Sequence, residues 1–357
     1  MTKDRLKRLR AFMVDYGLAA VIVNNPENRR YFSGFTGTAG MLLITRKKGF
    51  LITDFRYIEQ ARNQADCFEI VKHGNSIYET LAELAKDHQL EKIGFESDFT
   101  TYSTFQNFTK VIQENTLVPV MLDDLRAVKD DNEIKLIREA VKIADDAFSY
   151  ILSILKPGIR ERDIALELEY KMRQLGAEKA AFDIIVASGI RGALPHGVAS
   201  EKIIEPGDFV TMDFGAVYKG YHSDITRTVC VGKANSRQRE IYDIVLKAQL
   251  AGLQAIRSGN SCKDADFAAR TIIQNHKYGE YFGHGLGHGV GLVIHEEPRL
   301  SPSNVEGSLE EFMVVTVEPG IYIPEWGGVR IEDTVIVTAH NVEVLTKSSK
   351  QLIELDF

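Results

Sequence analysis

The sequence predicts two domains, a smaller α/β domain over residues 1–124 and an α+β domain over residues 125–357. Two patterns predict this division. Short β-like runs alternate with helical patterns in the first third of the chain, and a long amphipathic pattern begins near residue 131. After that point, two pairs of helical patterns each lead to a β-hairpin. A chain of 357 residues is also long enough for two cores.

The N-terminal domain is predicted from hydrophobic runs bounded by turn residues. The segments AAVIVNN (19–25), GMLLITRKKGFLITD (40–54) and KIGFES (92–97) are typical of strands, and SIYETLAELAKDH (76–88) is typical of a helix. Alternation of this kind favours an α/β domain with a mostly buried sheet.

The C-terminal domain repeats one architecture without repeating its sequence. Helices are expected over about 131–156 and 161–175, and again from near Ser236 and Ser261. The first has a capping box at Asp130 and Glu133, and Pro157 ends it. Hairpins follow at 209–232 and 312–338. Two such halves would pack as an antiparallel sheet with helices on one face.

Composition excludes several classes of protein. The 43 basic and 50 acidic residues give a net charge of −7, which argues against a nucleic-acid partner. No apolar run is long enough to span a bilayer, and the N-terminal pattern is an amphipathic helix rather than a signal peptide. Cys67, Cys230 and Cys262 are too scattered for a disulfide framework and are expected to be buried thiols. We therefore expect a cytoplasmic protein with no membrane partner.

Each predicted hairpin carries a pair of carboxylates. Asp213 and Asp224 are equally far from a predicted Tyr218–Lys219 turn, and Glu318 and Glu332 are equally far from the centre of the second hairpin. Residues equidistant from a turn face each other across the strands. One such pair could be two solvated surface residues. Two equivalent pairs among core residues require cations, and two divalent ions would roughly neutralise four carboxylates.

A glycine-rich stretch, HGLGHGVGLVIHEEP (284–298), contains His284, His288 and His295. Its alternating glycines would not hold a helix, and HExxH and GxGxxG are both absent. The glycines instead favour close backbone approach beside a crowded site. One imidazole would complete a five-residue ligand set. His196, in GALPHGVAS, precedes the first hairpin much as His295 precedes the second, which suggests two histidines on opposite sides of the cluster; the alternative is a loop histidine without a role in the site.

At this point the sequence resembles the methionine aminopeptidase/creatinase family, and within it the Xaa-Pro peptidases. The matching segments span nearly the whole chain: YFSGFTGTAG, TDFRYIEQA, LPHGVAS, MDFGA, YHSDITRT, HGLGHGVGLVIHEEP, VTVEPGIYIP and GGVRIEDT. The resemblance implies an α+β pita-bread catalytic domain with pseudo-twofold symmetry, preceded by a creatinase-like N-terminal α/β domain.

Carried over position by position, the resemblance implies five ligands for two divalent metal ions: Asp213, Asp224, His288, Glu318 and Glu332. Such an oxygen-rich set suits Mn²⁺ best, with Co²⁺, Fe²⁺ or Zn²⁺ as alternatives. His196 and His295 are expected to hydrogen-bond the reacting carbonyl.

The remaining site residues have expected roles outside this ligand set. Glu318 is expected to relay the proton of the attacking water. His284 and Arg299 are expected to contact substrate, although Arg299 is equally consistent with a surface ion pair. Arg330 lies on the same strand face as Glu332 and is expected to pair with a cluster carboxylate.

The resulting hypothesis is an Xaa-Pro aminopeptidase that uses a metal-bridged hydroxide on peptides with proline in second position. The alternative is an Xaa-Pro dipeptidase, or prolidase, restricted to dipeptides. A creatinase-like C–N hydrolase, a methionine aminopeptidase and a non-catalytic peptide-binding module are further alternatives. The complete ligand set argues against the first and last of these. The resemblance also implies a homodimer.

Overall fold

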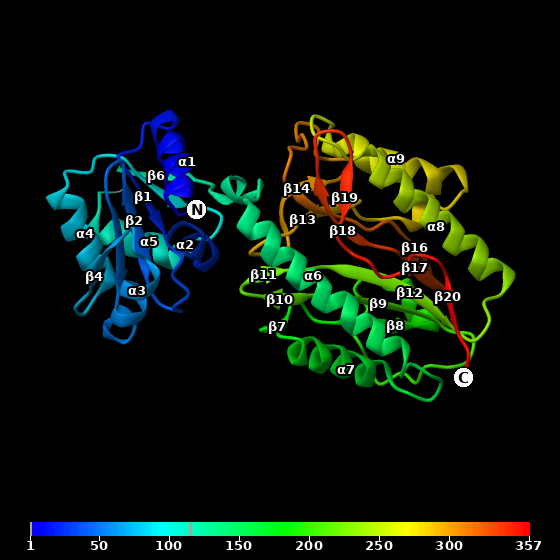
Figure 1. Ribbon diagram of the computed structural model, residues 1–357. Helices are drawn as coiled ribbons and strands as arrows, with labels where there is room; N and C mark the ends of the chain where they lie inside the picture. The colour runs from blue at the N-terminus through cyan, green and yellow to red at the C-terminus, as the bar shows by residue number, and fades with distance from the viewer. Residues whose placement is uncertain (1, 114–115) are drawn as a thin grey trace. The chain divides into compact units, whose positions relative to one another are not determined.

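The computed structural model describes residues 2–113 and 116–357 (Figure 1). The chain divides into two compact units, Met1–Arg126 and Ala127–Phe357. The predicted boundary at residues 124/125 lies two residues before this division. No helix among the described residues combines the length and the apolar character needed to cross a membrane.

The first unit is built on a six-stranded mixed sheet with the order β4-β3-β2-β1-β5-β6. Every residue of the four central strands is buried, as expected for a sheet covered on both faces. The strands are β1 (Ala20–Val23), β2 (Met41–Thr45), β3 (Gly49–Thr53), β4 (Glu69–Lys72), β5 (Ile93–Glu96) and β6 (Leu117–Val120). The helices are α1 (Thr2–Asp15), α2 (Pro26–Ser33), α3 (Ile58–Gln64), α4 (Ile77–Asp87) and α5 (Tyr102–Val111), with 3₁₀ turns at Phe55–Tyr57 and Asp123–Arg126.

The second unit uses one order of elements twice, a helix pair followed by strands (Figure 1). The first half contains α6 (Asp131–Leu152), α7 (Glu161–Gln174), β7 (Lys179–Ala180), β8 (Ile185–Ser188), β9 (Phe209–Phe214), β10 (Ala216–Tyr218), β11 (Tyr221–His222) and β12 (Ile225–Val231). The second contains α8 (Ser236–Ala255), α9 (Cys262–Asn275), β13 (Gly287–Gly289), β14 (Glu296–Leu300), β15 (Val314–Val317), β16 (Gly320–Ile323), β17 (Gly327–Arg330), β18 (Asp333–Val337), β19 (Val342–Val344) and β20 (Ile353–Leu355). Further 3₁₀ turns span Gly189–Ala193 and Gly279–Tyr281.

The strands of this unit are distributed over several sheets rather than over the single sheet expected. The larger two have the orders β20-β12-β9-β8 and β14-β13-β15-β18-β19, and β16-β17 and β11-β10-β7 are smaller. Each hairpin is interrupted between its strands, at Gly215 in the first and at Pro319 in the second. Pro319 has no N–H to donate, and a methyl group on Gly215 would lie 1.8 Å from the carbonyl oxygen of Ser223.

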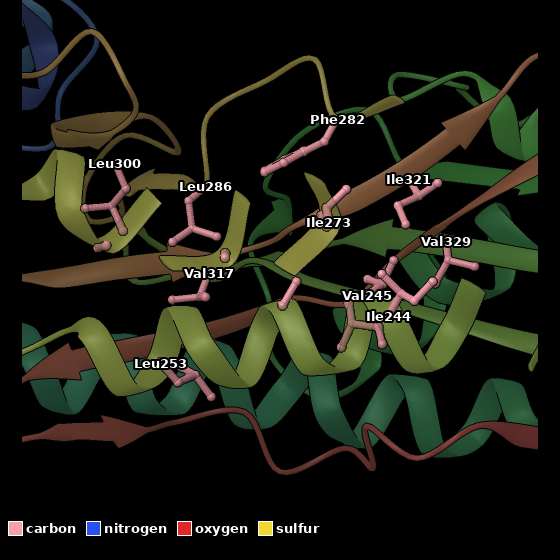
Figure 2. Packing of buried hydrophobic residues seen from close by; sticks show 14 of the residues in the cluster. Ile244, Val245, Leu253, Ile273, Phe282, Leu286, Leu300, Val317, Ile321 and Val329 are labelled. Atoms are coloured by element: carbon pink, nitrogen blue, oxygen red, sulfur yellow. The ribbon is translucent and has the colours of Figure 1, made fainter. Parts of the chain in front are cut away.

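Each half buries its own hydrophobic cluster between helices and sheet. In the second half, Ile244 and Val245 of α8 belong to one buried cluster with strand residues such as Val317 and Val329 (Figure 2). The capping box predicted at the start of α6 is present, and α6 ends at Leu152, four residues before the predicted end. All three cysteines are free thiols, and Cys67 is only half-buried, unlike the other two.

A buried ion pair joins β12 to β18. The guanidinium of Arg227 donates to the Oδ1 of Asp333 at 2.8 Å, and both side chains are at most 1% exposed. Asp333 also accepts from Lys350 at 2.6 Å and from Gln249 at 2.8 Å. Arg227 also donates to the carbonyl of Ser348 at 2.8 Å, and this hydrogen bond holds the C-terminal segment against β12.

Substitution of Arg227 by Met should lower the free energy of unfolding by about 3 kcal/mol, because it leaves the charge of Asp333 under-compensated. Urea denaturation followed by circular dichroism measures this change. Arg138→Met is the matched control, since Arg138 pairs with Glu343 at the surface and its loss should cost less than about 1 kcal/mol. Equal losses in the two variants would contradict this reading.

Candidate metal centre

The first hairpin brings its two carboxylates together with a different register from the one predicted. Asp213 lies opposite Thr226, not opposite Asp224, so the predicted direct pairing is wrong. The reason is the turn, which is centred on Lys219-Gly220, with positive φ values of 44° and 77°, rather than on Tyr218-Lys219. Asp224 is therefore a diagonal neighbour of Asp213.

The second hairpin keeps the predicted register. Val317 pairs with Asp333 and Gly320 pairs with Arg330, and the same register places Glu318 opposite Glu332. Both carboxylates therefore lie beside Pro319, where the ladder of the hairpin is interrupted.

Carboxylates from the two hairpins meet in one cluster. Ligand atoms of Asp213, Asp224 and Glu332 all lie within 4.8 Å of one another. One oxygen of Asp213 (Oδ1) and one of Glu332 (Oε1) are buried and have no hydrogen-bond partner among the described residues. Buried carboxylate oxygens without a donor are costly, and a bound cation would satisfy them. The cluster therefore fits divalent metal ions.

His288, on β13, brings an imidazole beside these carboxylates. Its Nδ1 lies 3.0 Å from the carbonyl of Gly289, which acts only as an acceptor, so Nδ1 carries the proton. Its Nε2 faces the cluster, 3.3 Å from Glu318 and 3.6 Å from Asp224. A hydrogen bond that holds one ring nitrogen and directs the other toward the carboxylates is the arrangement that a metal-ligating imidazole needs.

The glycines around His288 permit close backbone packing, as predicted. A methyl group on Gly287 would lie 2.1 Å from the carbonyl oxygen of Thr316, and one on Gly289 would lie 2.3 Å from that of Glu297. Only glycine lets β13 fit between its neighbouring strands at this point.

Hydroxyl and guanidinium groups orient the carboxylates from outside the cluster. Thr226 donates to Glu332 at 2.6 Å, and Thr316 donates to Glu318 at 3.0 Å. Arg330 donates to Asp213 at 2.6 Å and to Thr226 at 3.0 Å, so it pairs with a cluster carboxylate as predicted.

Tyr322 links Arg330 to His284. Its hydroxyl accepts from Arg330 at 3.0 Å and lies 2.9 Å from the Nε2 of His284. The Nδ1 of His284 faces the carbonyl of Gly285 at 2.8 Å, so both ring nitrogens of this histidine already have partners.

Tyr322, Thr226 and Thr316 were not predicted from the sequence as residues of this site. A signal was present, because each lies two or four residues from a ligand candidate and therefore on the same strand face.

Burial and mutual repulsion act together on the carboxylates. Burial raises the pKa of Asp213, Asp224 and Glu332, and neighbouring carboxylates raise the last two further. Burial alone would also raise the pKa of Glu318, but the hydrogen bond and charge of His288 outweigh it and lower this pKa to about 2. Arg330 and His288 compensate only part of the negative charge of the four carboxylates, and metal ions would supply the rest.

The cluster forms the floor of a cavity of about 740 Å³, which is large enough for a small peptide. His196, His295 and Arg299 line the cavity with exposed side chains, and Phe182 and Ile294 give it an apolar wall. The ring of His295 lies 4.4 Å from that of His288. Although this side chain is exposed, partial desolvation inside the cavity, followed by the charges of neighbouring groups, lowers the pKa of His295 to about 4. The predicted site residues therefore converge on one cavity.

Comparison with known proteins agrees with this geometry. Residues 135–339 match the model of metallopeptidase family M24, and residues 5–128 match that of the creatinase/prolidase N-terminal domain. The chain belongs to metallopeptidase family M24. The predicted resemblance and the predicted fold, a creatinase-like domain followed by a pita-bread domain, are thereby confirmed, and members of this family are hydrolases.

Three relatives illustrate the similarity. An Xaa-Pro dipeptidase from Pyrococcus furiosus is 43% identical over 98% of this chain and 100% of its own length. The structure of an Xaa-Pro dipeptidase from Bacillus anthracis matches with a TM-score of 0.97 and 50% identity, covering 99% and 100% of the two chains. An X-Pro aminopeptidase from Thermotoga maritima matches with a TM-score of 0.89 and 39% identity, covering 95% and 98%.

Substitution of Asp224 by Asn should weaken Mn²⁺ binding at least about 100-fold, because it removes a charged ligand where even indirect contacts typically cost 10- to 100-fold. Calorimetric titration of metal-free protein measures this affinity. Asp183→Asn is the matched control, since Asp183 lines the same cavity outside the cluster. Unchanged Mn²⁺ affinity in Asp224→Asn would remove Asp224 from the ligand set.

Proposed function

We propose that this M24 hydrolase is an Xaa-Pro dipeptidase that cleaves dipeptides with a C-terminal proline. The observation that carries the proposal is the position of Arg299. In the β13–β14 pairing Arg299 lies directly opposite His288, so both side chains leave the same face of the sheet. Arg299 lines the cavity, and its guanidinium has no ion-pair partner among the described residues.

An unpaired guanidinium beside the ligand cluster suits a substrate carboxylate. In Xaa-Pro the carboxylate belongs to the residue that follows the scissile bond, so Arg299 would hold it while the carbonyl of Xaa faces the cluster. Two relatives named as Xaa-Pro dipeptidases support this choice over the aminopeptidase that we expected from the sequence. The aminopeptidase stays the second candidate because of the likeness to the Thermotoga maritima X-Pro aminopeptidase.

The ligand set assigned by this proposal is Asp213, Asp224, His288, Glu318 and Glu332, and their oxygen-rich character favours Mn²⁺. Two bound ions would lower the pKa of a water molecule toward neutrality and polarise the substrate carbonyl.

The chain's own groups would position the substrate and move the protons. His295 and His196 line the cavity, and neither ring has a hydrogen-bond partner among the described residues. They are therefore placed to donate hydrogen bonds to the carbonyl oxygen as negative charge develops on it. Glu318 would accept the proton of the attacking water and pass it to the proline nitrogen as the C–N bond breaks.

The Xaa-Pro bond has no N–H, so recognition must depend on the ring and on the two ends of the substrate. The apolar wall that includes Phe182 and Ile294 offers a surface for the pyrrolidine ring.

Three finer assignments accompany the proposal. The metal is Mn²⁺, the protein acts as a homodimer, and its location is the cytoplasm. The last is supported by three free cysteines, which are typical of a reducing compartment.

Substitution of Arg299 by Met should raise KM for Ala-Pro about 10- to 100-fold with a smaller effect on kcat, because a charge-assisted hydrogen bond contributes ~1.5–3 kcal/mol. The matched control is Ala-Pro-amide, which lacks the carboxylate. Its hydrolysis by wild type and by Arg299→Met should differ little. An equal loss with both substrates would show that Arg299 does not hold the carboxylate.

Substitution of His295 by Ala should lower kcat for Ala-Pro about 100-fold, the usual cost of losing one hydrogen bond to a developing oxyanion. Steady-state kinetics measures this change, and Mn²⁺ affinity should remain that of wild type. His340→Ala, an exposed histidine outside the cavity, serves as the control. A kcat equal to that of wild type would exclude His295 from the mechanism.

A further inference from the structure

The loop that carries His196 is held by a buried carboxylate that the mechanism does not use. This loop, residues 189–199, follows β8, and its residues Pro195, His196 and Val198 line the cavity. The side chains of His196 and Val198 are exposed. Their burial therefore does not fix the position of the loop.

Glu161, the first residue of α7, has a side chain that is 0% exposed. Its Oε1 accepts from the backbone N–H of Ser188 at 2.7 Å and from the Ser188 hydroxyl at 2.8 Å. Its Oε2 accepts from the backbone N–H of Ser200 at 3.2 Å, from the Ser200 hydroxyl at 2.7 Å and from the guanidinium of Arg191. Ser188 immediately precedes the loop and Ser200 immediately follows it.

We propose that Glu161 is a positioning residue for His196: its carboxylate ties both ends of loop 189–199 together. This inference rests on the proposed function, in which His196 contacts substrate. Arg191 strengthens the same closure, since it also donates to the carbonyl of Val198 at 2.9 Å.

The far side of the loop is packed against β17. A methyl group on Gly192 would lie 2.9 Å from the backbone nitrogen of Gly328. Arg330, which holds Asp213, also donates to the carbonyl of Pro195 at 3.1 Å. The residue before His196 is thereby linked to the ligand cluster, and Glu161 fixes the ends from which this link extends.

A carboxylate suits this position because its donors cannot adapt. The N–H groups of Ser188 and Ser200 and the guanidinium of Arg191 can only donate, and each oxygen of Glu161 meets at least one of them. In Glu161→Gln, either orientation of the amide turns an NH₂ group toward an N–H donor. Apolar residues at the position of a buried charge often stabilise a fold as well as the charge does, or better. A contribution to the free energy of folding is therefore a weak explanation for a buried carboxylate at position 161.

The test uses Glu161→Gln in the full-length chain, with Glu201→Gln as the matched control. Glu201 forms its ion pairs with Arg160 and Arg162 at the surface of the same segment, so its loss should matter little. The first readout is amide hydrogen exchange without metal, in which Glu161→Gln should accelerate exchange across residues 189–199 and leave α8 unchanged.

The second readout is kcat/KM for Ala-Pro at saturating Mn²⁺. Glu161→Gln should lower kcat/KM about 10- to 100-fold, the order of loss expected from a small misplacement of a substrate-contacting group. In a His196→Ala background the same change should cost less than about twofold, because residues that act through one another are not additive. A general structural defect would reduce activity equally in both backgrounds. Mn²⁺ affinity should not change.

Ser200→Ala removes one donor and serves as a milder variant if Glu161→Gln does not fold. It should change loop exchange and kcat/KM in the same direction, and it should be non-additive with His196→Ala. Unchanged exchange in the loop, or an activity loss that is additive with His196→Ala, would overturn the proposal. If wild type does not cleave Ala-Pro, the proposed function fails, whereas the exchange comparison still tests whether Glu161 holds the loop.

Discussion

Four carboxylates share one small buried volume in the second unit, and the hairpins must hold them there against their mutual repulsion. The hairpin of each half supplies two of them, so the cluster exists only when both halves have folded against each other. Asp213 and Glu332 each keep a buried oxygen without a donor. Such an arrangement is costly by itself and becomes favourable with cations. The metal requirement of this M24 chain thus follows from its backbone register.

The surrounding structure can be understood as support for this cluster. Short contacts from Thr226, Thr316 and Arg330 fix where each carboxylate points. Small residues bring the backbones close enough for this to happen, as at Gly287 between its neighbouring strands. Glu161 performs the corresponding task for the loop on the substrate side. Thr226, Thr316 and Arg330 thus orient the carboxylates of the cluster, whereas Glu161 orients the loop that carries His196.

Periodicity and resemblance were sufficient to predict both domains and the convergence of the site. Glu318 and Glu332 could be placed opposite each other because their register depends only on distance along one hairpin. The register of Asp213 was predicted wrongly because a left-handed conformation at Lys219 moves the turn by one residue, and composition does not encode that choice. Glu161 could not have been found, since its donors are distant in sequence and meet only in the folded chain.

The most direct test of the account compares products by mass spectrometry after chelation and again after addition of Mn²⁺. Ala-Pro and a longer Ala-Pro-Xaa peptide are given to the enzyme in parallel. The account predicts Mn²⁺-dependent hydrolysis of Ala-Pro and an intact longer peptide. Release of alanine from the longer peptide would contradict the dipeptidase assignment in favour of the aminopeptidase. Absence of metal-dependent cleavage of either peptide would contradict the Xaa-Pro assignment itself.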